Sequence, residues 1–439
     1  MKKLLISLVL LLFAVQMTNA QSKSATDALK VLDKAKQDTE NPKKSAAPNT
    51  WVKLGTAYVE CYDAPIKGIW QNASQMEVKM ILKDQPILSS TQEEKNGRTF
   101  SVDNYADKAL YYDENGTLVA WVVKTPVLQE DALELAYNAF KKAEELDVKK
   151  SASKTITEAL KGLQSRVINE AMSSYSLGDN KKASEEFEQA WIIAGDPLIG
   201  LVDSTMAYYA AVTASMAGDN DRTIKFLEYC RSIDYDQKGD VYATLAEAYK
   251  TKGDTAKAKE LLATGFTKYP SSQGILVALI NIYLESNDNP EKVLSFLEVA
   301  QKNEPNNPSL YYAEGNVYKK LGKFEQAIAS FRKAAEVDPN YFFAPFSEGD
   351  AYYSMAIDLQ DKAQQELDDA KFAELQNQME QALENAIAPF ERAFSITQEK
   401  DLQLGCAEYL KQIYFRFRDK KPEYKEAYEK YNKFIEDSK

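Results

Sequence analysis

Few types of side chain in this sequence could act in catalysis or bind a metal ion. The 439-residue sequence has no histidine, three cysteines and 66 Asp plus Glu residues. Without histidine, Ser-His-Asp and Cys-His catalysis, His-containing zinc sites and the usual general base near neutral pH are excluded. The sequence also lacks G-x-x-x-x-G-K-[ST], G-x-S-x-G and C-x-x-C motifs and any dinucleotide-type glycine triplet. It therefore predicts no catalytic residue, no metal site and no cofactor site.

Carboxylates are the one abundant reactive group. Pairs of them can catalyse hydrolysis without histidine, but acidic pairs are also common on exposed helix faces. The loops at 218–221 and 286–289 are rich in Asp and Asn, yet they lack the alternating spacing and terminal Glu of a calcium loop. Both loops fall between predicted helices, so we interpret their polar residues as turn and N-cap residues.

Helices are the elements that must position any functional residue, and their clearest pattern spans residues 311–339. Small and aromatic residues recur there every three or four positions, so they share one face in each of two helices. A turn at Gly322 separates the helices, and Pro339 cannot continue the second one. The shared faces contain Tyr311, Gly315 and Tyr318, then Ala327, Phe331 and Ala334.

This unit recurs along the chain. Gly178, Gly218 and Gly253 are 40 and 35 residues apart, whereas Pro270, Pro305 and Pro339 are 35 and 34 residues apart. A period near 34 residues indicates a solenoid of stacked helix pairs. The pattern resembles the tetratricopeptide repeat. That resemblance implies an all-α fold, a right-handed superhelix (α-solenoid) of about six or seven repeats.

The first repeat is interrupted. Residues 51–58 resemble the first half of a tetratricopeptide repeat, but the matching second helix appears only at Ala136, Phe140 and Ala143. Residues 61–128 are therefore predicted to be a small α+β insertion. Its expected elements are a helix at 71–82, a strand at 98–102, and a hairpin of 109–112 and 117–123 turning at Asn115-Gly116.

Six aromatic residues are expected to form a small core or cap in this insertion, and a specific docking surface is the alternative. They are Trp70, Phe100, Tyr105, Tyr111, Tyr112 and Trp121. Elsewhere, Cys230 falls at a small-residue position of a repeat and is interpreted as a buried apolar residue.

The N-terminus resembles bacterial export signals. Lys2 and Lys3 precede an apolar run from Leu4 to Val15, and Ala20 offers a cleavage site. The run is too short to span a bilayer. We therefore predict a cleaved signal peptide at 1–20 and a periplasmic location, with secretion as the alternative.

The predicted organisation has six segments. They are 1–20 (signal peptide), 21–50 (helix and linker), 51–147 (first repeat with its insertion), 155–340 (consecutive repeats), 341–398 (a repeat with an extended helical hairpin) and 399–439 (capping helices).

Charge and the repeat together predict the class of partner. Loss of Lys2 and Lys3 would change the net charge from −12 to −14, which disfavours nucleic acid and anionic membranes. No segment after the signal could span a membrane. The resemblance implies a concave groove that binds proteins or peptides. Its candidate residues are Tyr208, Asn281, Tyr312 and Asn316.

These observations predict a non-enzymatic periplasmic scaffold or adaptor that binds protein or peptide partners in its groove. One alternative is a factor for cell-envelope assembly or polysaccharide handling. Another is a carboxylate-based hydrolase whose site lies in the insertion.

Overall fold

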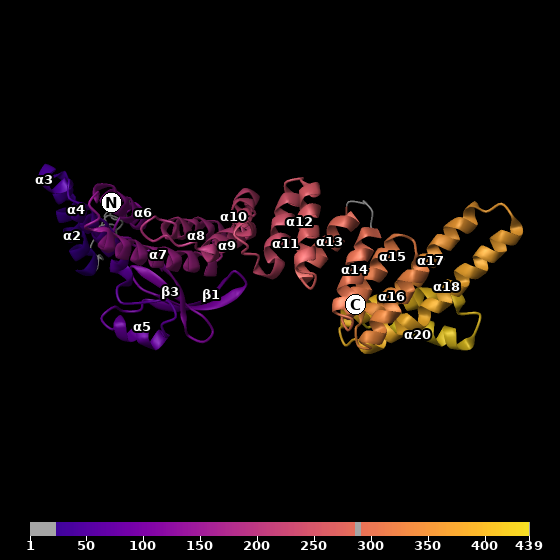
Figure 1. The fold of residues 1–439 in the computed structure, drawn as a ribbon. Coiled ribbons are helices and arrows are strands. Elements are labelled where there is room, and N and C mark those ends of the chain that lie inside the picture. Colours follow the sequence, from indigo (N-terminus) through magenta and orange to yellow (C-terminus); the bar gives the residue numbers. More distant parts are fainter. Residues whose placement is uncertain (1–22, 286–290, 439) are drawn as a thin grey trace, which may run out of the picture. The chain divides into compact units, whose positions relative to one another are not determined.

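The computed structural model describes residues 23–285 and 291–438. The predicted signal peptide and the loop at 286–289 lie outside this part. The chain divides between Asp236 and Gln237 into two compact units, and paired helices dominate both (Figure 1). The predicted helical solenoid with a small α+β insertion is therefore confirmed. Within the described residues, no helix is long and apolar enough to cross a membrane.

The first unit consists of helix pairs and one sheet (Figure 1). Its helices are α2 (Lys23–Glu40), α3 (Pro42–Ser45), α4 (Pro48–Asp63), α5 (Gln75–Ile81), α6 (Ala132–Leu146), α7 (Ser153–Ser176), α8 (Asn180–Ala194), α9 (Ser204–Met216) and α10 (Asn220–Ser232). α4 packs against α6, α7 against α8, and α9 against α10. The polar linker after α2 contains the short helix α3, which begins at Pro42 and is capped by the Asn41 side chain.

The second unit continues the same plan. Its helices are α11 (Asp240–Thr251), α12 (Thr255–Lys268), α13 (Gln273–Glu285), α14 (Glu291–Asn303), α15 (Pro308–Lys320), α16 (Phe324–Val337), α17 (Phe343–Gln365), α18 (Asp369–Ile396), α19 (Lys400–Phe417) and α20 (Pro422–Glu436). α17 and α18 form a hairpin of 23 and 28 residues. This hairpin shares an apolar core with α19 and α20.

A Gly-Asp junction ends one helix and begins the next in three pairs. Gly178, Gly218 and Gly253 have φ of 86°, 76° and 88°, a region that glycine enters without strain. The following aspartates, Asp179 and Asp219, accept hydrogen bonds from Lys182 N and Arg222 N at 3.1 Å. The Asp at 219 is thus an N-cap residue, as its position in the sequence predicted.

In several pairs the helices cross where a glycine faces an aromatic ring. A Cβ atom at Gly315 would lie 2.5 Å from Cε1 of Phe331. A Cβ atom at Gly55 would overlap the ring of Phe140 in the same way. The first repeat therefore closes across its insertion, because α4 and α6 make the contact that α15 and α16 make without interruption.

The insertion folds as a four-stranded antiparallel sheet in the order β1-β2-β3-β4. Its strands are β1 (Ser89–Lys95), β2 (Arg98–Asn104), β3 (Lys108–Tyr112) and β4 (Leu118–Val123). The predicted hairpin, third strand and helix are confirmed as β3–β4, β2 and α5. The exposed strand β1 was not predicted, because its sequence SSTQEEK has no apolar alternation.

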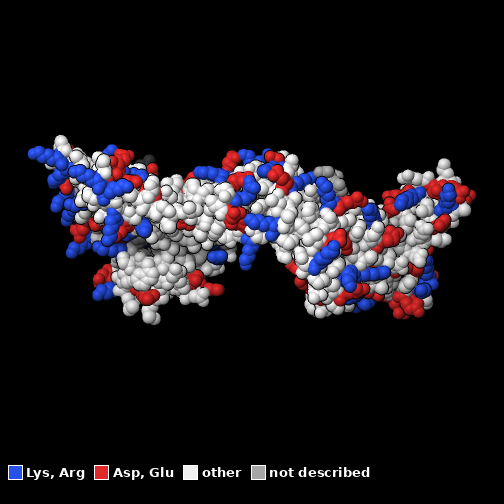
Figure 2. Space-filling view, viewed as in Figure 1, with Lys and Arg blue, Asp and Glu red and all other residues white. Residues whose placement is uncertain are grey.

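Five of the six expected aromatic core residues are buried. Tyr105, Tyr112 and Trp121 lie in one apolar cluster, and Phe100 and Tyr111 lie in a second that contacts Leu177. Trp70 is the exception, because its side chain is 49% exposed. On the face shown in Figure 2, the insertion presents mainly uncharged surface, whereas basic and acidic side chains are interspersed over the helices of this unit.

Candidate partner-binding site

Two adjoining cavities lie between the insertion and the helices of the first unit. The first, about 720 Å³, is lined by α2, the end of α4, the segment after it and α7. The second, about 590 Å³, is lined by the end of α4, β4 and the segment after it, and α6, α7 and α8. We call them the α2 pocket and the insertion pocket. Tyr62 and Trp121 line both.

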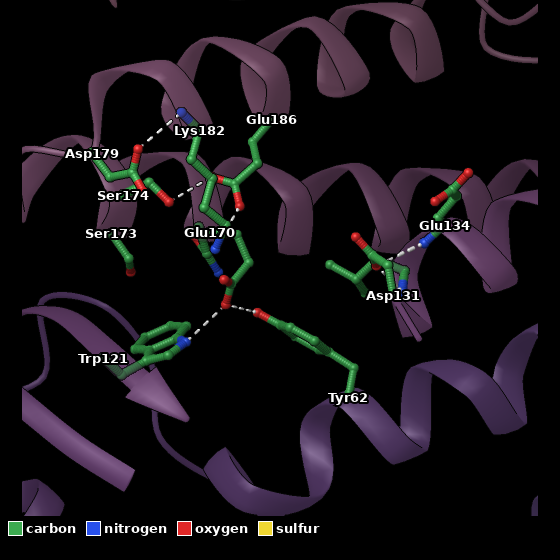
Figure 3. A network of polar contacts seen from close by, with 12 residues as sticks. Tyr62, Trp121, Asp131, Glu134, Glu170, Ser173, Ser174, Asp179, Lys182 and Glu186 are labelled. Carbon is green, nitrogen blue, oxygen red and sulfur yellow. Dashed lines mark hydrogen bonds and ion pairs between the residues drawn. The ribbon is translucent and has the colours of Figure 1, made fainter. Parts of the chain in front are cut away.

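Glu170 of α7 joins the insertion to the repeat helices (Figure 3). Its Oε1 atom accepts a hydrogen bond from the Tyr62 hydroxyl at 2.5 Å and another from Trp121 Nε1 at 3.1 Å. Tyr62 is contributed by α4 and Trp121 by β4, so three elements meet at one carboxylate. Both donors are neutral, and within the described residues no ammonium or guanidinium forms an ion pair with Glu170.

Glu186 of α8 is the second carboxylate of the insertion pocket. Its Oε2 atom accepts a hydrogen bond from the Ser174 hydroxyl at 2.7 Å, and its Oε1 atom lies 3.3 Å from Nζ of Lys182 (Figure 3). The Glu186 side chain is 15% exposed, whereas that of Lys182 is 56% exposed. The carboxylate is therefore held inside the pocket, and the ammonium lies at its mouth.

Burial changes the acidity of this group of side chains. It raises the pKa of Glu186 to about 6; Ser174 and Lys182 oppose the shift, and the charge of Glu170 adds to it. Burial also raises the pKa of Tyr62, reinforced by the charge of Glu170, so its hydroxyl remains a hydrogen-bond donor. For Lys182, burial lowers the pKa, but the charges of Glu186 and Glu170 outweigh it and raise the pKa.

Two further carboxylates of the pocket cap helices. Asp131 accepts hydrogen bonds from the backbone N–H groups of Leu133 and Glu134 at 2.8 and 3.0 Å, and so begins α6. Asp179 begins α8 in the same way. Because helix N-termini carry partial positive charge, these two charges are partly compensated. A further carboxylate, that of Glu130, is exposed, so Glu170 and Glu186 dominate the charge inside the pocket.

The α2 pocket is built around an ion pair. Arg166 of α7 donates from Nε to Oδ1 of Asp63 at 2.9 Å and from Nη2 to Oδ2 at 2.6 Å. Its Nη1 atom donates to the carbonyl of Gly162 at 2.8 Å. Because a two-pronged pair fixes both partners, the end of α4 is held against α7. This contact gives the α2 pocket a defined wall.

The residues predicted from the sequence lie elsewhere. Tyr208 is on α9 in the first unit, and Asn281, Tyr312 and Asn316 are on α13 and α15 in the second. Asn281 is exposed, and Asn316 is half-buried one helical turn from Tyr312. The Tyr208 ring centroid lies 5.9 Å from that of Tyr235.

Tyr312 belongs to an aromatic group. Its ring centroid lies 5.9 Å from those of Phe331 and Tyr341 and 6.0 Å from that of Phe343. The side chain therefore packs on its own helix pair and on the start of the next. Asn281 and Asn316 remain a prediction as partner-binding residues, as do Tyr208 and Tyr312.

Sequence reasoning missed the pocket residues. Glu170 lies 108 positions from Tyr62 and 49 from Trp121, so no local spacing relates them. A weak signal exists in α8, where Glu186 directly precedes the buried Phe187. An acidic residue beside a core position needs compensation when the helix is packed, and Ser174 and Lys182 supply it.

The two carboxylates of the insertion pocket have different surroundings. A pair of carboxylates of which one has a raised pKa is what acid–base hydrolysis uses. Here, however, Glu170 accepts hydrogen bonds from two neutral donors, Tyr62 and Trp121, through Oε1 alone, whereas Glu186 is held by Ser174 and Lys182. In the described part of the chain, no group of three or more Cys, Asp or Glu residues is placed to hold a metal ion.

Comparison with protein families identifies the repeat. A family model described as "Tetratricopeptide repeat" matches residues 308–341, and a second model with the same description matches residues 239–265. A comparison with curated proteins finds no match.

Several solved structures are similar in part. The C-terminal part of a TPR repeat-containing protein from Cytophaga hutchinsonii is 15% identical, with a TM-score of 0.42 over 64% of this chain and 93% of that one. A tetratricopeptide repeat protein from Parabacteroides merdae is 15% identical, with a TM-score of 0.37 over 56% and 98%. MamA residues 41-end from Desulfovibrio magneticus are 15% identical, with a TM-score of 0.31 over 44% and 96%.

Proposed function

Because this chain is a tetratricopeptide-repeat protein and hence a protein-interaction scaffold, we propose that it binds an extended segment of a protein partner between its insertion and α7. The observation that carries this proposal is the pair of adjoining cavities, separated by the contact of Tyr62 and Trp121 with Glu170. Each cavity has a volume typical of ligand pockets, which are about 300–1,000 Å³. Two such pockets in a row suit two side chains of one bound segment.

The length of the groove sets the length of that segment. The α7 residues that line the two cavities run from Ser165 to Leu177, a helical distance of about 18 Å. An extended chain advances about 3.3 Å per residue, so roughly five residues would fit along it. In this proposal the scaffold is not an enzyme, and the insertion serves as the second wall of the groove.

The same proposal includes a periplasmic location. It is supported by the N-terminal sequence, in which Lys2 and Lys3 precede the apolar run from Leu4 to Val15. In that compartment the scaffold would join protein partners of the cell envelope.

Site-specific photo-crosslinking tests the proposed groove. A photoreactive amino acid is placed at Leu128, which lines the insertion pocket, at Val277, which is 53% exposed one turn before Asn281, and at Val148, which is 87% exposed. We expect one partner to be crosslinked in cells from position 128 and not from the control at 148. Crosslinking from 277 but not from 128 would place the binding site on α13, near Asn281, and contradict the proposal.

A further inference from the structure

We propose that the insertion pocket recognises a positively charged side chain, lysine or arginine, of the bound segment. This inference rests on the proposed function of the groove and names the chemistry of its ligand. The first support is the balance of charge in the pocket. Its lining residues include five carboxylates and one ammonium, that of Lys182; the carboxylates belong to Glu130, Asp131, Glu170, Asp179 and Glu186.

The second support is the state of the Glu170 carboxylate. Both of its hydrogen bonds, from Tyr62 and Trp121, end on Oε1. In the described residues its Oε2 atom accepts no hydrogen bond, so a carboxylate with one free oxygen stands in the groove. Lys182 forms its ion pair with Glu186 and interacts with Glu170 only through the charge, so the place of a cation in contact with Glu170 is left to the ligand. An ionised donor makes the stronger class of hydrogen bond to such an oxygen.

The third support is the apolar part of the wall. Val127, Leu128 and Leu177 line the same pocket as Glu170. Lysine and arginine bury their aliphatic stems against such surface while the charged end reaches a polar partner. The ring of Trp121 also lines the pocket, and an indole face attracts a nearby cation. A neutral side chain of equal length would use the apolar wall but would bring no charged donor to Oε2 of Glu170.

Peptide selection tests the inference. The chain without residues 1–20 is immobilised and captures peptides from a random decapeptide pool, and the captured peptides are identified by mass spectrometry. We expect enrichment of one basic residue per peptide. The best peptide is then titrated by calorimetry beside two analogues, with citrulline in place of arginine or norleucine in place of lysine. We expect each analogue to bind at least tenfold more weakly.

Variants assign the effect to the pocket. Glu170→Gln keeps an oxygen that can accept from Tyr62 and Trp121 but removes the charge, and Glu186→Gln is a second variant should the first not fold. We expect Glu170→Gln to lose at least tenfold affinity for the basic peptide and to bind the neutral analogue like the parent. Glu298→Gln, at a 66% exposed position, is the matched control and should change neither.

The outcomes separate this inference from the proposed function. If peptides are captured without enrichment of lysine or arginine, or if Glu170→Gln binds the basic peptide like the parent, the inference of cation recognition is wrong. The proposal that the groove binds a protein segment is then unaffected. If position 128 crosslinks no partner and no peptide is captured, both ideas are wrong.

Discussion

The split pair α4/α6 and the uninterrupted pair α15/α16 close around the same contact. In each, a glycine of the first helix faces a phenylalanine ring of the second, Gly55 against Phe140 and Gly315 against Phe331. The two pairs differ in what lies beside the first helix. The end of α4 meets the insertion and contributes Tyr62 to the insertion pocket, whereas α15 meets the aromatic rings around Tyr312.

This difference shows that the packing of the two helices of a repeat does not depend on whether the repeat also lines a pocket. The helix crossing needs a few local side chains, so it tolerates about seventy residues between its halves; loop-closure entropy grows only with the logarithm of loop length. The insertion then adds a wall that an uninterrupted repeat does not have. In the first unit this wall brings Trp121 to Glu170.

The largest effect should come from filling the crossing. Gly55→Leu and Gly315→Leu each place a side chain where the facing phenylalanine ring already lies. We expect each to destabilise its unit by about 3 kcal/mol, the upper part of the usual range for overpacking. Thermal melting of the two variants measures this loss, and similar losses would show that the split repeat is as tightly closed as the continuous one.

A matched glycine controls for helix propensity. A Cβ atom at Gly162 of α7 would lie 3.5 Å from Nη1 of Arg166, an ordinary contact. Gly162→Ala should therefore stabilise the chain by up to about 1 kcal/mol, because alanine favours a helix over glycine. If Gly55→Leu melts like the parent, the crossing in the split repeat is looser than the structure indicates.

A smaller, pH-dependent effect should distinguish the groove from the rest of the chain. The folded-state pKa of Glu186 is about 6, above its ordinary value of 4.5, so ionising this carboxylate disfavours the folded state. The stability that its neutral form provides is present below pH 4.5 and is lost as the pH rises through about 6. Glu186→Gln should therefore be more stable than the parent at pH 7–8 by about 1–2 kcal/mol.

The neighbours of Glu186 limit that gain. Glu170 and Ser174 face it from α7 and Lys182 faces it from α8, and the variant loses the ion pair with Lys182. Since that lysine is more than half exposed, the loss is small. Melting curves between pH 4 and 8 should converge at the acid end, and Glu298→Gln should show no such trend. A Glu186→Gln variant that is less stable at pH 8 would mean that the ion pair outweighs burial.

The smallest effect on stability should come from replacing Asn281 and Asn316, two of the partner-binding residues predicted from the sequence. Asn281→Ala combined with Asn316→Ala changes one exposed side chain of α13 and one half-buried side chain of α15. We expect the free energy of unfolding to change by no more than about 0.5 kcal/mol. We also expect partner capture to weaken less than it does in Glu170→Gln. A larger loss of capture would place the main binding surface on the repeats and not beside the insertion.

Much of the fold could be predicted because its signals are local. The recurring glycines, alanines and aromatics marked the helix crossings, and Asn115-Gly116 marked the hairpin turn that the structure confirms between β3 and β4. Strand β1 had no such signal, because an exposed, polar edge strand is stabilised by its backbone pairing with β2. The prediction that Trp70 is buried was wrong, because an aromatic side chain is buried only on average.

By itself, the sequence determined the helix pairs, their period and the place where the first pair is interrupted. These features depend on spacings of three, four or about 34 residues, which a linear sequence displays directly. Only the tertiary structure decided that Tyr62, Trp121 and Glu170 meet and that Glu186 lies in the same pocket, with its side chain 15% exposed. The physical reason is that these contacts form only when the inserted sheet folds back against α7. The residues next to Glu170 in the sequence carry no information about that packing.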